Sequence, residues 1–107
     1  MNEALVREQA GRARREFLRW VLLLTMNISR PLPAQRRLLL QVAQGEYADC
    51  TELEVTRELH YLRERDLCHV ETDPLGYVTA SLTRHGVDVA EYTVVCEAGI
   101  ARPAKYW

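Results

Sequence analysis

Residues 51–86 read TELEVTRELHYLRERDLCHVETDPLGYVTASLTRHG, and this stretch decides the fold. It opens with Thr51 followed three residues later by Glu54, which is the spacing of a helix capping box. The apolar residues that follow recur at intervals of three and four, so they predict a helix that ends near Arg65 or Asp66. The buried stripe of this helix is expected to be Val55, Leu59 and Leu62.

A β-hairpin is expected directly after this helix. Apolar and polar residues alternate over 67–72 and again over 77–82. The sequence Asp73-Pro74-Leu75-Gly76 lies between them, with proline and glycine where a type I turn or its bulged hairpin variant needs them. Thr83 is placed to cap a short helix over 84–91.

Two helices are expected ahead of residue 51. Residues 3–29 predict a long helix that ends before Pro31, because proline disfavours helical geometry at the preceding residue. A second helix is expected from Pro33 to a stop at Gly45. The apolar stripe of the long helix is Ala10, Ala13, Phe17, Trp20 or Val21, Leu24 and Ile28, with arginines opposite. The second helix has Leu38, Leu39, Val42 and Ala43 as its apolar residues, and Arg36 and Arg37 face outward.

The expected organisation is one folded domain with an extension at each end. Residues 1–14 are an N-terminal arm or helix extension, since Gly11 costs about 1 kcal/mol relative to alanine inside a helix. Residues 15–92 form the domain, and 93–107 form a C-terminal tail in which 93–96 pairs as a strand. The 107 residues are 48% hydrophobic and 27% charged, which is typical of one soluble globular domain.

Membrane and secretory classes are disfavoured. The longest mainly apolar run, Trp20 to Met26, is far shorter than the roughly 20 residues that cross a bilayer. Acidic Glu3 and Glu8 at the start do not fit a signal peptide. The cysteines are three in number, widely spaced and without a C-x-x-C pair, so we expect free thiols in a reducing, intracellular compartment.

Charge is divided unevenly along the chain although the net charge is −1. Residues 1–44 carry eight arginines against three acids, and residues 45–107 carry six basic residues against twelve acids. We expect the basic N-terminal segment, residues 1–44, to pack beside the acidic C-terminal segment, residues 45–107, in the same or a neighbouring subunit. The competing interpretation is a phosphate-binding surface of Arg12, Arg14, Arg15, Arg19, Arg36 and Arg37.

The order helix, helix, helix, two-stranded hairpin resembles that of a winged helix-turn-helix domain. LHYLRERDL at 59–67 is similar to the end of a winged-helix recognition helix running into the first wing strand. SLTRHG at 81–86 resembles the leucine-threonine-x-x-glycine signature that follows the wing in many bacterial regulators. The resemblance covers about 15–92 and implies a mainly α fold with a small β-hairpin and, here, a long N-terminal helix.

Three shorter stretches are similar to small winged-helix proteins of Mu-like bacteriophages and prophages, which are described as regulators. They are YLRER at 61–65, GVDVAE at 86–91 and GIARP at 99–103. This resemblance implies a DNA-binding regulator or architectural factor in the cytoplasm of a bacterial host cell.

Winged-helix regulators place their third helix in the major groove and their wing on the backbone or minor groove. On the helix over 52–65, Arg57 is placed to fork onto a guanine and Tyr61 to reach a phosphate. Arg36 and Arg37 are expected to contact phosphates as well. The predicted DNA-binding residues are therefore Arg36, Arg37, Thr56, Arg57, His60, Tyr61 and Arg63.

Acidic residues support an alternative function. Residues 51–66 hold five acids against three arginines, and the hairpin adds Glu71 and Asp73 with no arginine or lysine between Asp66 and Arg84. Carboxylates repel nearby phosphates, so direct reading of DNA is disfavoured by these charges. The alternative is a protein-interaction module that holds a protein partner with its acidic third helix and wing. Glu58 is expected on the exposed face of that helix, one turn from Glu54.

Catalytic and metal sites are not expected, and neither is a cofactor. The sequence has no glycine-rich phosphate loop, no G-x-S-x-G and no H-E-x-x-H. Adjacent Cys68 and His69 would face opposite sides of a strand.

A homodimer through the long helix is expected, because its apolar surface is wide for so small a domain. That surface comprises Phe17, Trp20, Val21, Leu24 and Ile28.

Overall fold

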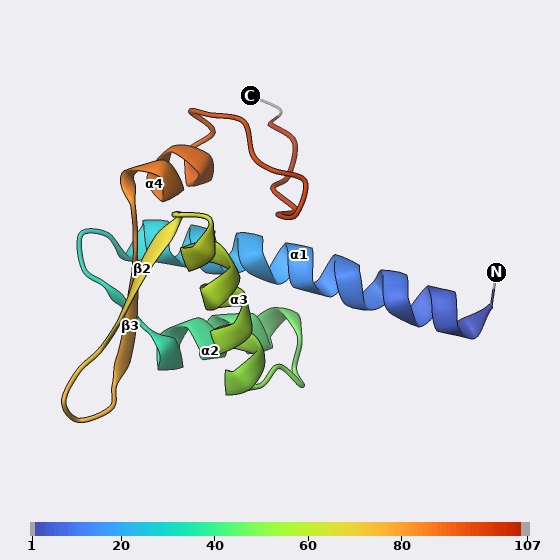
Figure 1. Cartoon of the computed structure of the whole chain (residues 1–107), viewed down its shortest axis with the longest axis horizontal. Helices are drawn as coiled ribbons and strands as arrows, with labels where there is room; N and C mark the ends of the chain where they lie inside the picture. The colour runs from blue at the N-terminus through green and yellow to red at the C-terminus, as the bar shows by residue number, and fades with distance from the viewer. Residues whose placement is uncertain (1, 106–107) are drawn as a thin grey trace.

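The computed structural model describes residues 2–105. The elements in chain order are α1 (Glu3–Ser29), β1 (Ala34–Gln35), α2 (Arg36–Glu46), α3 (Glu52–Glu64), β2 (Cys68–Thr72), β3 (Val78–Leu82) and α4 (Arg84–Ala90). In Figure 1 the N-terminal half of α1 extends beyond the rest of the molecule, with α2 below α1, α3 crossing it and α4 above it. The expected fold class is confirmed: the chain is mainly helical with a small antiparallel sheet and a long N-terminal helix, an arrangement compatible with a winged-helix fold.

The sheet has three strands in the order β1-β3-β2. The hairpin forms as predicted, with Val70 opposite Ala80, and its turn is built on the Asp73 carboxylate, which accepts the N–H groups of Leu75 and Tyr77 at 2.9 Å. Gly76 has φ +88, a conformation that favours glycine.

Two expectations about the sheet are wrong. Ala34 pairs with Ala80 of β3, so α2 begins at Arg36 rather than at Pro33. The second edge of β3 is thereby occupied, and residues 93–96 form bends at Thr93 and Val94 and irregular structure at Val95 and Cys96 instead of the expected strand. Both corrections have one physical reason: pairing with β1 satisfies the backbone groups along the edge of β3.

The core lies where α1 meets the other helices and the sheet. Its most deeply buried large side chains are Leu18, Leu22, Leu23, Met26, Leu39, Val55, Leu59 and Leu62. The predicted stripe of α3 is therefore confirmed, and so is its cap, because Thr51 Oγ1 accepts the N–H of Glu54 at 3.2 Å. The reciprocal half of the capping box is not formed, since the Glu54 carboxylate binds Arg14 instead.

The predicted burial of α1 and α2 needs correction. Leu24 is 38% exposed and Ile28 is 75% exposed, whereas the expected dimer residues Trp20 and Val21 are buried. In α1 the buried residues extend over most of the circumference, because α2, α3, α4 and β3 all pack on this helix. On α2, Leu39 and Ala43 are buried, while two further expected residues, Leu38 and Val42, are 42% and 37% exposed. Helical periodicity identifies the apolar positions of a helix, but it does not show which of two adjacent faces is buried.

Several helix ends follow the sequence closely. α1 ends at Ser29 with Arg30 in an extended conformation before Pro31, and it continues through Gly11 without a break. Thr83 caps α4 by accepting the N–H of Gly86 at 3.0 Å. A Cβ on Gly86 would lie 2.0 Å from the carbonyl oxygen of Leu67, so this glycine permits α4 to approach the start of the hairpin. Within residues 2–105, no helix is both long and apolar enough to span a membrane.

Candidate nucleic-acid interface

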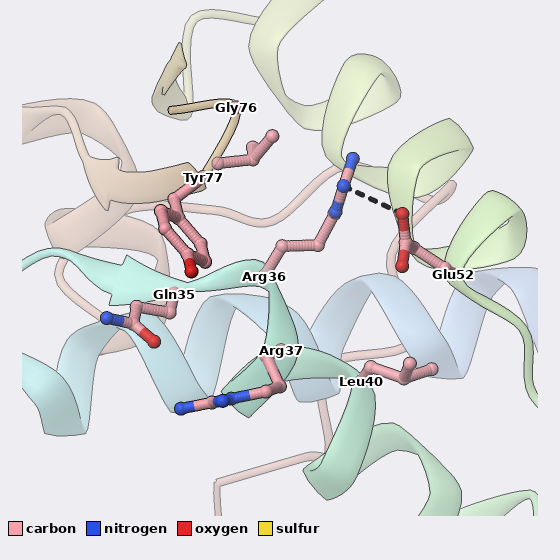
Figure 2. A pocket seen from close by; sticks show the side chains of 8 residues that line it. Gln35, Arg36, Arg37, Leu40, Glu52, Gly76 and Tyr77 are labelled. Atoms are coloured by element: carbon pink, nitrogen blue, oxygen red, sulfur yellow. Dashed lines mark ion pairs between the residues drawn. The ribbon is translucent and has the colours of Figure 1, made fainter. Parts of the chain in front are cut away.

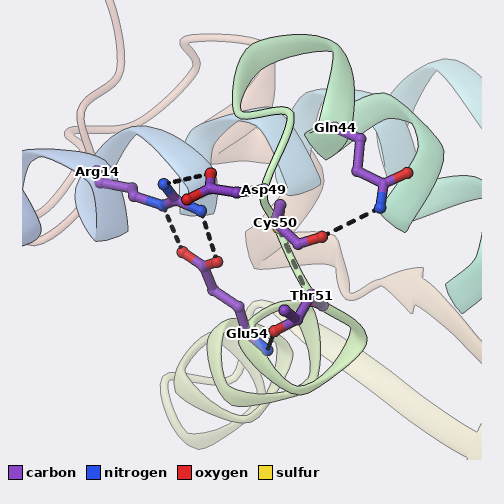
Figure 3. A network of polar contacts seen from close by, with 6 residues as sticks. All are labelled: Arg14, Gln44, Asp49, Cys50, Thr51 and Glu54. Atoms are coloured by element: carbon purple, nitrogen blue, oxygen red, sulfur yellow. Dashed lines mark hydrogen bonds and ion pairs between the residues drawn. The ribbon is translucent and has the colours of Figure 1, made fainter.

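The basic N-terminal segment, residues 1–44, packs beside the acidic C-terminal segment, residues 45–107, within the same chain. Arg14 of α1 binds both carboxylate oxygens of Glu54 at 2.7 and 2.9 Å and reaches Asp49 at 2.8 Å (Figure 3). These hydrogen bonds lower the pKa of both carboxyl groups and raise the pKa of the Arg14 guanidinium. Arg14 is thereby committed to an internal network rather than to an open phosphate surface.

The other carboxylates at the start and middle of α3 are paired in the same way. Arg36 Nη2 of α2 lies 2.7 Å from Glu52 Oε1. Arg19 Nε donates to Glu58 at 2.7 Å, and Glu58 is only 4% exposed, so the expectation of an exposed Glu58 is wrong. Its carboxylate is buried because α1 brings an arginine to it. Three of the five acids in 51–66 are thus neutralised by arginines from other helices.

These pairs leave two arginines of α3, Arg57 and Arg63, available to a partner. Helical spacing places Arg57, His60 and Glu64 along the side opposite the core, which we call the outward ridge of α3, and all three are exposed. Arg63 is also exposed. In the part of the chain from 2 to 105, neither Arg57 nor Arg63 forms an ion pair.

Five of the seven predicted DNA-binding residues surround a cleft between the helices and the hairpin. One cavity, of about 320 Å³, lies between the start of α2 and the hairpin, with Arg37 and Tyr77 on its rim (Figure 2). An adjoining cavity of about 170 Å³ lies against α3. Arg36 and Val78 line both. We call this the α2–hairpin cleft, and the predicted residues along it are Arg36, Arg37, Thr56, His60 and Arg63.

The remaining two predicted residues lie elsewhere. Arg57 lines a cavity of about 310 Å³ between α1 and α3, together with Arg15. Tyr61 points toward α1 and the C-terminal segment, where its hydroxyl donates to Glu97 and its ring lies between two guanidinium groups.

The exposed apolar residues beside the cleft were not predicted as functional. Leu75 is 82% and Tyr77 63% exposed in and beside the hairpin turn, and Leu53, which lines the cavity between α1 and α3, is 58% exposed. The signal was present in the sequence, because Leu75 stands inside a turn and Leu53 lies off the buried stripe of its helix. From Leu67 to Thr83 the hairpin contributes no arginine or lysine to this surface.

Two thiols, those of Cys50 and Cys68, are buried. Burial raises the pKa of Cys50 to about 11 and that of Cys68 to about 11, so both are protonated. The three cysteines are free. Among residues 2–105, no group of acidic, histidine and cysteine side chains is arranged to hold a metal ion.

Acid stability is predicted to depend on Arg14. Because Arg14 holds the pKa of Glu54 below its usual value of 4.5, the pair stabilises the folded state above that pH and loses its effect as the pH falls through the lowered pKa. Arg14→Gln is expected to reduce the free energy of unfolding at neutral pH, with a difference that shrinks in acid. Urea denaturation at a series of pH values measures this, and a difference that stays constant down to about pH 3 contradicts the assignment.

Comparison with known proteins shows a shared fold. The sequence matches no protein-family model and no curated protein. A crystal structure of a presumed DNA-binding protein from Ralstonia eutropha JMP134 is similar, with a TM-score of 0.60 and 21% sequence identity. The similarity covers 71% of this chain and 93% of that one. At this identity the likeness extends to the fold.

Proposed function

We propose that the chain binds duplex DNA with the outward ridge of α3 and the start of α2. The observation that carries this proposal is the internal pairing of Glu52, Glu54 and Glu58 with arginines of α1 and α2. Since those carboxylates are neutralised, the repulsion expected from the acidic third helix is much reduced. The fold shared with the Ralstonia protein, which is described as a presumed DNA-binding protein, supports the same function.

The residues have separate roles in this proposal. Arg57 is exposed on α3 and reads a guanine edge with its planar fork. Arg37 and Arg63 neutralise phosphates, and Arg36 sits between them, held in place by Glu52. Thr56 and His60 supply shorter polar contacts from the same side of α3. Tyr61 is left out of the interface because its hydroxyl is used by Glu97.

The resemblance to Mu-like phage proteins supports a role as a regulator or architectural factor, acting in the cytoplasm of the bacterial host cell. The homodimer through α1 stays a prediction, and Leu24 and Ile28 are the members of its expected surface that are exposed. Light scattering across micromolar concentrations measures it, and a species of 12.4 kDa throughout excludes it.

DNA affinity is predicted to fall linearly with salt on a log-log plot, with a slope of about −0.9 for each phosphate contact. Arg37→Ala is expected to weaken binding to all sequences alike and to reduce the steepness of the slope by about 1. Arg57→Ala is expected to cost about 1 to 3 kcal/mol and to relax base preference at one position. Fluorescence anisotropy with random and selected duplexes at several salt concentrations measures both.

Arg84→Ala is the matched control for these variants. It removes the same charge from α4, where Arg84 is exposed and pairs with Asp88 of its own helix. Its slope should equal that of the parent protein. If Arg84→Ala reduces the slope as much as Arg37→Ala does, binding reflects net charge alone and the proposed interface is wrong.

A protein-interaction module is the second candidate function. The observation that favours it is the hairpin, which exposes Leu75 and Tyr77 and carries no arginine or lysine from Leu67 to Thr83. Apolar tips of this kind are typical of contacts with protein. If no duplex binds even at about 50 mM salt, where the electrostatic attraction is strong, this second function replaces the first.

A further inference from the structure

The segment after α4 folds back onto α1 and α3 and is held there by many contacts. Arg19 Nη1 of α1 donates to the carbonyl oxygen of Gly99 at 2.8 Å, and the N–H of Ala101 donates to the carbonyl oxygen of Glu16 at 3.0 Å. Ile100 between them is 4% exposed. The segment also passes over the upper side of α1 in Figure 1. Residues 97–101 are therefore part of the folded structure.

Tyr61 of α3 is the centre of this packing. Its ring lies between the guanidinium groups of Arg19 and Arg65, whose central carbons are 3.4 and 3.5 Å from the ring centroid. Its hydroxyl donates to Glu97, and Arg65 Nε lies 3.0 Å from the same carboxylate. A cation on each face of an aromatic ring is a favourable arrangement, and each hydrogen bond to a charged group adds to it.

Gly99 fits closely against this centre. A Cβ at residue 99 would lie 2.0 Å from the Tyr61 hydroxyl oxygen, so any other residue there must displace the segment or the tyrosine. The same Arg19 that covers Tyr61 also neutralises the buried Glu58. One arginine thus joins α1, α3 and the C-terminal segment.

We infer that Tyr61, Arg65 and Glu97, together with Gly99, form a clasp that positions α3 for DNA binding without touching DNA. This inference rests on the proposed function. The clasp holds the side of α3 that faces away from the α2–hairpin cleft, so it determines how Arg57, His60 and Arg63 are presented. When the clasp is broken, α3 occupies its binding orientation for only part of the time, and the apparent affinity falls by that fraction.

Glu97→Ala tests the clasp because the clasp and simple electrostatics predict opposite changes in DNA affinity. The substitution removes a negative charge, which by electrostatics alone would strengthen DNA binding. The clasp predicts the opposite, an affinity about 3- to 10-fold weaker. Glu46→Ala removes a negative charge from the exposed end of α2 and is expected to bind DNA as well as the parent or slightly better. Tighter or unchanged binding by Glu97→Ala overturns the clasp.

Gly99→Ala tests the same packing without removing any contact group. Gly45→Ala is its control, because nothing lies within 4 Å of a Cβ at residue 45. Hydrogen exchange of the α3 backbone amides is followed in parallel for every variant. Gly99→Ala is expected to raise exchange in the last turn of α3 and to weaken DNA binding, whereas Gly45→Ala is expected to do neither.

The outcomes separate the clasp from the proposed function. If the parent protein binds no duplex, the proposed function fails, and unchanged exchange in Glu97→Ala then shows that no clasp exists. If the parent binds DNA and Gly99→Ala raises α3 exchange without weakening binding, the segment is structural only and the positioning role is wrong. Weaker binding with raised exchange, in both variants and in neither control, is the result that supports the inference.

Discussion

Replacing Glu58 by alanine is expected to destabilise the protein by about 3 to 5 kcal/mol, because it leaves a buried guanidinium without its carboxylate. The side chains of Arg19 and Glu58 are only 13% and 5% exposed, so water replaces little of the lost interaction. The substitution should also weaken the packing of the clasp, since Arg19 contacts Tyr61 and Gly99 as well as Glu58. Thermal and urea denaturation measure this free energy.

Glu64→Ala is the control for this prediction. Glu64 lies at the end of α3, is exposed, and should change stability by no more than about 0.5 kcal/mol. The double variant Arg19→Met with Glu58→Leu is expected to recover only part of the loss, because it removes the unpaired charge but also the contacts of Arg19 with Tyr61 and Gly99. Equal losses for Glu58→Ala and Glu64→Ala contradict the burial of the ion pair.

Leu59→Ala and Leu62→Ala are each expected to destabilise the protein by about 2 to 5 kcal/mol, through lost apolar burial and the cavity that remains. Both side chains are at most 1% exposed and lie where α3 meets the core. The comparison is Leu53→Ala on the same helix, where the side chain is 58% exposed and little burial is lost. Chemical denaturation of the three variants ranks them, and a loss for Leu53→Ala as large as that for Leu62→Ala contradicts the assigned core face.

The affinity of the Leu53→Ala variant for DNA or another partner tests a property other than its stability. Leu53 lies on the outward side of α3, so Leu53→Ala is more informative about a partner than about folding. A stable Leu53→Ala protein that loses affinity for its partner places that partner on the outward ridge of α3.

Local signals in the sequence were sufficient for much of the fold. Thr51 and Thr83 start helices because a hydroxyl that accepts a backbone N–H within the next turn needs no distant partner. Asp73 and Gly76 shape the hairpin turn in the same local way. The alternation of apolar and polar residues predicted the two strands of the hairpin. Apolar residues spaced three and four apart predicted the buried stripe of α3. These features depend on residues within about one turn of each other.

The tertiary structure decided what depends on residues far apart in the chain. Glu58 is 39 residues from the arginine that neutralises it, and no local pattern distinguishes it from a solvated acid. The same holds for Tyr61, whose hydroxyl finds Glu97 rather than a phosphate, and for Ala34, which β3 draws out of the expected helix. The composition of α3 indicated an acidic surface, but the energy of a charge depends on what lies within a few ångströms of it. Sequence therefore determined the helices and the hairpin, while packing determined the strand β1 and which charges remain available to a partner.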